Sequence, residues 1–138
     1  MRVLVPTIAL TALALTGCAM SPAETARAQA RAEADRAALG KQLAGLSPAE
    51  KTDCLDNYRT APASLSAYGP ALVYRVSDRL IYVNDTGGGC EAVERGDILI
   101  TRSNAGRLCR GDIGRTVTPG STVPSGSCAL GSFTAYRK

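Results

Sequence analysis

The chain has 138 residues, a net charge of +4, five cysteines, and neither histidine nor tryptophan. This length suits one domain, and 45% hydrophobic with 20% charged residues is typical of a folded protein. The absence of histidine excludes Ser–His–Asp and Cys–His catalysis and every zinc site that needs an imidazole.

Residues 1–17 have the features of a bacterial export signal. Arg2 precedes an apolar stretch, Val3–Leu15, of about 13 residues, which is too short to span a bilayer but suits a signal-peptide core. The stretch ends in LTGC at 15–18, which resembles the lipobox of bacterial lipoproteins. The resemblance implies cleavage before Cys18 and attachment of fatty acyl chains there, which together anchor a protein stably. The alternatives are a secretory signal cut elsewhere and a buried apolar helix.

The position after the lipobox cysteine indicates where the protein is sorted. Ala19 rather than aspartate resembles the enterobacterial pattern for the outer membrane, facing the periplasm. Removing residues 1–17 leaves 15 basic and 12 acidic side chains. This balance is too mild to indicate nucleic acid. The expected partners are membrane lipid through Cys18 and an envelope protein or glycan.

Residues 18–52 are predicted to hold a helical spacer between the lipid and a folded domain. Ser21 as N-cap, Pro22 at the first helical position and Glu24 in a capping box predict the start of a helix. The Ala-rich stretch from there to Leu46 predicts about 23 helical residues, or about 35 Å. An oligomerisation helix is the weaker alternative, because no heptad of large residues is sustained. SPAE recurs at 47–50 and predicts a second short helix over 48–53.

Residues 53–138 predict a small antiparallel β-sandwich or barrel-like domain. Two β-rich runs over 71–84 flank Ser77-Asp78 and predict a hairpin. Further strands are expected at 97–102, 113–118 and 129–136, separated by turns at 87–89, 103–106 and 119–127. The side chains expected on one face of the hairpin are Leu72, Tyr74, Val76, Leu80 and Tyr82.

The four remaining cysteines predict two disulfides, because an exported protein meets an oxidising compartment. Spacing alone does not settle the pairing. We favour the nested pattern, Cys54–Cys128 with Cys90–Cys109, which would tie the start of the domain to its last strand. The sequential pattern, Cys54–Cys90 with Cys109–Cys128, is the near alternative. Successive cysteines lie at least 19 positions apart, unlike the close pairs of zinc sites and thiol oxidoreductases.

Several short stretches from Cys54 to Arg137 together resemble a family of small proteobacterial lipoproteins with no established activity. The resemblance implies envelope location and disulfide-type cysteines, and it implies no catalytic residues. The stretches are LVYRV at 72–76, YVND at 82–85, GGC at 88–90, LCRGDI at 108–113, GSC at 126–128 and FTAYR at 133–137.

Four motifs could carry a function. Arg110-Gly111-Asp112 could bind an adhesion receptor, but turn chemistry, with Asp112 capping local amides, is the favoured interpretation. DTG at 85–87 resembles an aspartic protease triplet without its required partner. GGG at 87–89 could hold an anion, although a flexible loop is favoured. The terminal Lys138 resembles the peptidoglycan-linked end of the major outer-membrane lipoprotein.

The sequence therefore predicts no catalytic residue, metal site or cofactor, and a non-catalytic structural or interaction role for a lipid-anchored envelope protein. The alternative is a β domain that binds a small ligand or glycan through Arg110, Asp112 and exposed Tyr74 and Tyr82. A hydrolase, or linkage to peptidoglycan through Lys138, is less favoured. A pocket above about 300 Å³ would favour a ligand, and a large exposed apolar patch would favour a protein partner.

Overall fold

The computed structural model describes residues 20–56, 64–103 and 106–138. The export signal and Cys18 lie outside these residues, so what the sequence predicts for them stays a prediction. Among the described residues, no helix combines the length and the apolar composition needed to cross a membrane. The elements are α1 (Pro22–Gln42), β1 (Ser47–Thr52), β2 (Cys54–Asp56), β3 (Ser64–Tyr68), β4 (Ala71–Ser77), β5 (Leu80–Asp85), the 3₁₀ helix η1 (Glu91–Arg95), β6 (Ile98–Thr101), β7 (Arg107–Cys109), β8 (Ile113–Val117), β9 (Pro124–Ala129) and β10 (Phe133–Arg137).

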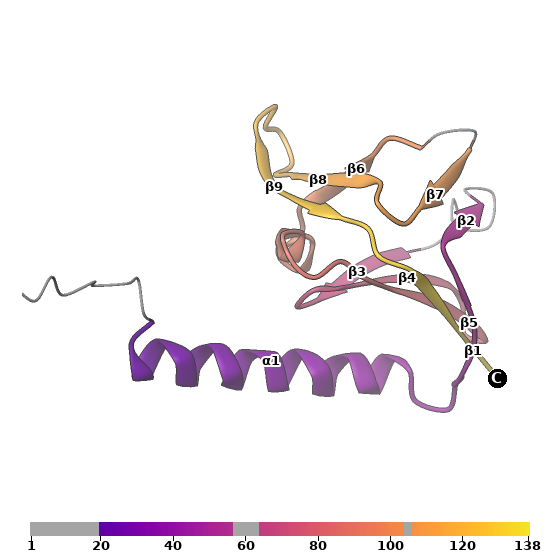
Figure 1. Cartoon of the computed structure of the whole chain (residues 1–138), viewed down its shortest axis with the longest axis horizontal. Helices are drawn as coiled ribbons and strands as arrows, with labels where there is room; N and C mark the ends of the chain where they lie inside the picture. Colours follow the sequence, from indigo (N-terminus) through magenta and orange to yellow (C-terminus); the bar gives the residue numbers. More distant parts are fainter. Residues whose placement is uncertain (1–19, 57–63, 104–105) are drawn as a thin grey trace, which may run out of the picture.

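The mainly β fold behind a leading helix is confirmed, and it is arranged in three layers (Figure 1). The middle layer, sheet A, is antiparallel with strand order β1-β10-β5-β4-β3. The helix α1 lies along one face of sheet A. The other face is covered by sheet C, with order β6-β8-β9, and by the two-stranded ribbon β2-β7. The three sheets formed by the described residues are open.

The hydrophobic core lies between sheet A and the layer formed by η1, sheet C and the ribbon. The predicted hairpin is confirmed as β4 and β5, and Leu72, Tyr74 and Tyr82 from its predicted face are buried in this core. The ring of Tyr74 packs against that of Phe133, with the centroids 6.0 Å apart. The layer opposite sheet A contributes Leu55, Cys90, Val93, Leu108, Cys128 and Leu130.

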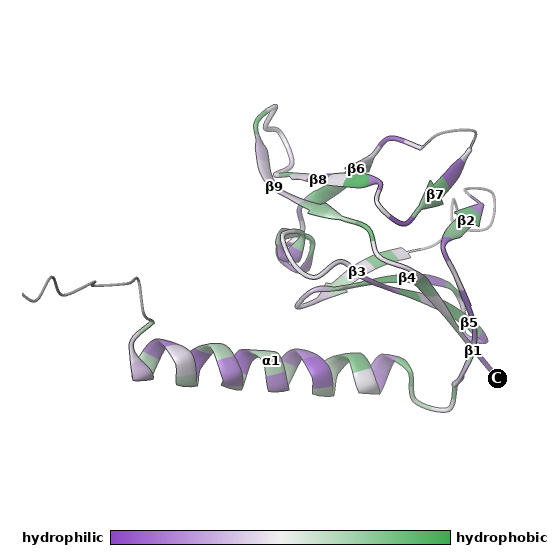
Figure 2. Cartoon of the chain, viewed as in Figure 1, coloured by the Kyte–Doolittle hydropathy of each residue, from purple (hydrophilic) through white to green (hydrophobic). Residues whose placement is uncertain are grey.

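The start of α1 is formed by the predicted capping box. The Glu24 backbone N–H donates to the Ser21 hydroxyl, and the Ser21 backbone N–H donates to the Glu24 carboxylate. No residue of α1 is buried, and hydrophilic residues occur along its whole length (Figure 2). The helix is nevertheless tied to sheet A, because Arg75 of β4 donates to the Gln42 side chain at 2.6 Å. The predicted free spacer therefore lies against the domain in the structure.

Two secondary-structure predictions are wrong. The expected second helix is the strand β1, which pairs with β10 at the edge of sheet A. An edge strand tolerates Pro48, which lacks an N–H group, and pairing with β10 outweighs the local helix-start signal. The expected strand over 129–136 is two strands, β9 and β10, separated by 130–132. The predicted turn at 119–127 accordingly contains the first part of β9.

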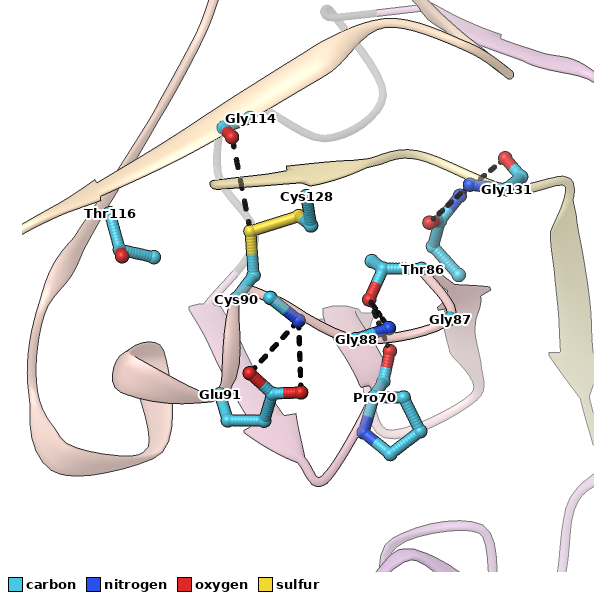
Figure 3. Close-up of a disulfide and its surroundings, with 12 residues drawn as sticks. Pro70, Thr86, Gly87, Gly88, Cys90, Glu91, Gly114, Thr116, Cys128 and Gly131 are labelled. Atoms are coloured by element: carbon cyan, nitrogen blue, oxygen red, sulfur yellow. Dashed lines mark hydrogen bonds between the residues drawn. A yellow bond between two sulfur atoms is a disulfide. The ribbon is translucent and has the colours of Figure 1, made fainter. Parts of the chain in front are cut away.

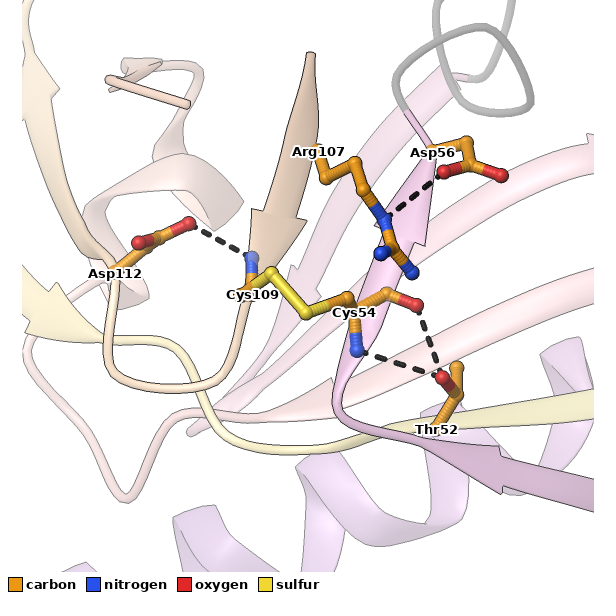
Figure 4. A network of polar contacts seen from close by, with 6 residues as sticks. All are labelled: Thr52, Cys54, Asp56, Arg107, Cys109 and Asp112. Atoms are coloured by element: carbon orange, nitrogen blue, oxygen red, sulfur yellow. Dashed lines mark hydrogen bonds and ion pairs between the residues drawn. A yellow bond between two sulfur atoms is a disulfide. The ribbon is translucent and has the colours of Figure 1, made fainter. Parts of the chain in front are cut away.

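All four cysteines of the domain form disulfides, as expected, but both proposed pairings are wrong. The observed pairs interleave along the chain: Cys54–Cys109 and Cys90–Cys128. Cys54 and Cys109 are directly opposite each other in the β2-β7 ribbon, with 4.0 Å between their Cα atoms (Figure 4). Cys90 precedes η1 and reaches Cys128 in β9 (Figure 3). Strand pairing over 55 residues of sequence decides the first bond, and spacing does not contain that information.

Candidate functional site: a cleft on the helix side of sheet A

Two adjoining hollows open on the face of sheet A that is turned toward α1. The larger, of about 890 Å³, lies between α1, the β3-β4 turn, the end of β5 and η1. The smaller, of about 470 Å³, lies over β1, β10 and the segments around Arg110 and Ser132. Both hollows are lined by Val83 and Asp85, so they adjoin at the end of β5. We call the two together the sheet A cleft.

The cleft exists because α1 carries large apolar side chains only near its C-terminal end. There Leu39 and Leu43 are half-buried, and Val73 and Ile81, on the helix side of sheet A, are 2% and 0% exposed. Toward its start the helix presents Ala28 to the same face. A methyl group is too short to fill the space between a helix and a sheet. Because the large apolar residues lie at one end of α1 and alanines at the other, a hollow remains between the first part of the helix and sheet A.

Cations outnumber carboxylates in the cleft, six to four. None of the six cations makes an ion pair within the described part of the chain. By contrast, Glu24, Asp85 and Glu91 already accept hydrogen bonds from nearby residues of the chain. The six cations are Arg27, Arg31, Arg36, Lys51, Arg95 and Arg110, and the four carboxylates are Glu24, Asp35, Asp85 and Glu91.

The hydrogen bonds of the capping box lower the pKa of Glu24, a carboxylate that lines the sheet A cleft. The Ser21 hydroxyl, and then the Ser21 backbone N–H, hold the pKa of Glu24 below its ordinary value. This carboxylate is therefore ionised throughout the neutral range and is engaged at the helix start. It forms no ion pair with Arg27 or Arg31 within the described residues.

The glycine loop after β5 binds its own side chains. The N–H groups of Gly87 and Gly88 donate to Asp85 and Thr86, each at 3.1 Å. The Gly89 N–H donates to both carboxylate oxygens of Glu91 at 2.9 Å (Figure 3). These amides are therefore not free to cradle an anion, and the DTG triplet is the turn that follows a strand.

The structure separates the four predicted binding residues. Tyr74 and Tyr82 are 6% and 2% exposed, so the expectation that they are exposed binding side chains is wrong. Asp112 accepts the Cys109 N–H at 2.7 Å beside Gly111, which has a φ of 90°, so the expected turn chemistry is confirmed (Figure 4). Arg110 is exposed and lines the smaller hollow, which makes it the predicted residue that the structure places in the cleft.

Sequence reasoning missed most of the cleft. Arg27 and Arg31 are one helical turn apart on an Ala-rich helix, and that spacing was the available signal for a basic face. Lys51 and Tyr136 come from the paired strands β1 and β10, whose pairing is not visible in the sequence. Cys54, Cys90, Cys109 and Cys128 are all in disulfides, so none of them offers a thiolate to a metal. The described residues hold no cluster of metal-ligating side chains.

No family model, curated protein or solved structure matches this chain.

Proposed function

We propose that the protein is a lipid-anchored, non-catalytic module of the cell envelope that binds an extended anionic ligand, of the acidic glycan type, in the sheet A cleft. The observation that carries this proposal is the set of six cations without ion pairs in the described chain. Five of the six are arginines, whose planar guanidinium groups bind carboxylates and phosphates in a bidentate manner. A bound anion would supply the partners that the folded chain does not.

The shape and the aromatic residues of the cleft support a glycan rather than a small free ion. The larger hollow has the volume of typical ligand sites, which is about 300–1,000 Å³. The second hollow continues it across the sheet. Tyr68 lines the larger hollow and Tyr136 the smaller one. Each offers a flat apolar ring with a hydroxyl at its end, which suits sugar faces and hydroxyls together.

The proposed anchor would hold the cleft near a membrane. Cys18 is three positions before Ser21, the N-cap of α1. The 21 residues of α1 span about 31 Å, and the same helix forms one wall of the cleft. Acylation at Cys18 would therefore keep the ligand site within about one helix length of the bilayer. Cys18→Ala should move the protein from the membrane fraction to the soluble fraction, and unchanged fractionation would contradict the anchor.

Calorimetric titration of the full chain in detergent micelles tests the ligand class. Tetragalacturonate is the anionic probe, and maltotetraose is the uncharged probe of equal length. Arg31→Gln on α1 and Arg95→Gln on η1 change two of the elements that line the larger hollow, and Arg79→Gln, in the β4-β5 turn, is the matched control. Each wall variant should weaken tetragalacturonate binding about tenfold, because a charged hydrogen bond contributes about 1.5 kcal/mol. Equal binding of maltotetraose, or equal loss in the control, would refute the proposal.

A further inference from the structure

The outer face of sheet C carries three exposed isoleucines. Ile98, Ile100 and Ile113 are 55%, 51% and 54% exposed. Ile98 and Ile100 alternate with Leu99, which packs against the core, so both point away from it. Ile113 lies on the neighbouring strand β8, where it alternates with the buried Gly114. Hydrophobic colouring marks β6 in Figure 2. Exposed apolar side chains grouped on one sheet face indicate an interaction surface.

The strand that carries two of these isoleucines is at an open edge. Sheet C has the order β6-β8-β9, and no strand of the described chain pairs with the free side of β6. The backbone N–H and C=O groups on that side can therefore pair with an added strand. Strand addition supplies backbone hydrogen bonds for affinity, and the side chains of alternate residues supply specificity. The face with the exposed isoleucines thus extends to a sheet edge at which a further strand can pair.

The charge beside the isoleucines selects the partner. Arg115 is opposite Ile100 in the β6-β8 register, and Arg102 continues the row of Ile98 and Ile100 just after β6. Both arginines are exposed, and neither makes an ion pair within residues 20–56, 64–103 and 106–138. Neither β6 nor β8 contains a carboxylate, so a second copy paired through β6 would bring no acidic side chain of these strands to the arginines. An acidic segment would instead meet complementary charge.

We propose that β6 accepts an extended segment of a partner protein as a fourth strand of sheet C. The segment places a carboxylate opposite Ile100, where it binds Arg102 or Arg115, and apolar side chains two residues before and after it on the same face, one of them on Ile98. The spacing of strands, about 4.8 Å, leaves both arginines within side-chain reach of the added strand. This surface is on sheet C, whereas the cleft is on the helix side of sheet A, so the two proposals are independent.

Methyl NMR of the full chain tests the proposal, because the chain has only five isoleucines. Ile81 is fully buried on sheet A and is the internal control. The probe is the heptapeptide TVTETVT, and the matched probe, TVTKTVT, replaces its glutamate with lysine. The acidic peptide should shift the methyl signals of the three exposed isoleucines but not that of Ile81. The lysine peptide should bind at least about tenfold more weakly.

Reversing the charge of the two exposed arginines tests the proposed carboxylate contact without changing a buried residue. Arg102→Glu with Arg115→Glu should reverse the preference to the lysine peptide, and Arg79→Glu should leave it unchanged. The proposal is overturned if neither peptide shifts the exposed isoleucines, or if both peptides bind equally. Shifts that follow protein concentration alone would overturn it in favour of a second copy. Shifts with anionic vesicles but not with the acidic peptide would overturn it in favour of a membrane surface.

Discussion

Replacing Tyr74 with phenylalanine should stabilise the protein. The Tyr74 side chain is 6% exposed, and its hydroxyl oxygen is the one buried side-chain polar atom without a hydrogen-bond partner among the described residues. Burying an unpaired hydroxyl costs about 1–3 kcal/mol. Tyr74→Phe removes that oxygen and keeps the ring that packs on Phe133. We expect the free energy of unfolding to rise by about 1 kcal/mol, since the small space left by the oxygen offsets part of the gain.

The same residue predicts a difference in alkaline stability. Burial raises the pKa of Tyr74 to about 12, whereas an exposed phenol has a pKa of about 10. The unfolded chain therefore releases this proton at a lower pH than the folded chain. The free energy of unfolding is independent of this ionisation below pH 10, where Tyr74 is protonated in both states. As the pH rises from 10 through about 12, the unfolded state ionises first and the free energy of unfolding falls. Wild type should lose about 2 kcal/mol more than Tyr74→Phe between these two pH values.

Chemical denaturation of both forms at pH 7 and at intervals up to pH 12 measures these differences. The two proteins differ only at residue 74, so the difference between the two curves isolates Tyr74. Tyr136→Phe, at a half-buried position in the cleft, is the matched control and should change stability by less than about 0.5 kcal/mol. The reasoning is refuted if Tyr74→Phe is destabilising at pH 7, or if its stability falls in parallel with wild type above pH 10.

Three further predictions concern the packing around β5 and β9. Asn84→Ala should lower the free energy of unfolding in urea by about 3 kcal/mol. Asn84 is fully buried, its side-chain N–H donates to the Gly131 carbonyl, and its side-chain oxygen accepts from the Gly131 N–H. A loss below about 1 kcal/mol would contradict this role. Gly89→Ala should lower the melting temperature far more than Gly87→Ala, because a Cβ at 89 would lie 2.1 Å from a carbonyl oxygen of β9, whereas the space at 87 is open; equal losses would contradict it. Replacing Cys90 and Cys128 together by serine should cost about 4 kcal/mol from loop entropy, and non-reducing peptide mapping of wild type should recover that pair; any other pairing would refute the fold described above.

The sequence was most informative where structure depends on neighbouring residues. The capping box at Ser21 and Glu24 forms within one helical turn, and the β4-β5 hairpin closes over a two-residue turn, so local patterns predict both. The turn at Gly111 and Asp112 has the same origin. The strand β1 was predicted wrongly as a helix, because the local sequence SPAE at 47–50 favours a helix start, whereas pairing with β10 makes the segment a strand.

The cleft depends on contacts that no local pattern contains. Its walls come from α1, sheet A and η1, and its depth follows from alanines on α1 facing a sheet whose order is not visible in the sequence. Arg110 could be selected in advance because it is beside a predicted turn. Lys51 could not, because its strand was expected to be a helix. The buried positions of Tyr74 and Tyr82 likewise depend on which face of sheet A receives the second layer.

The sequence by itself determined the composition-based exclusions, the predicted export signal and the start of the helix, the hairpin and the oxidised state of four cysteines. These depend on residue types or on interactions between residues close in the chain. Only the tertiary structure decided the interleaved disulfides, the helix lying on sheet A, the cleft whose cations form no ion pair among the described residues, and the open isoleucine edge of sheet C. Each of these joins segments far apart in the chain, and the pairing of such segments is set by the energy of the whole fold.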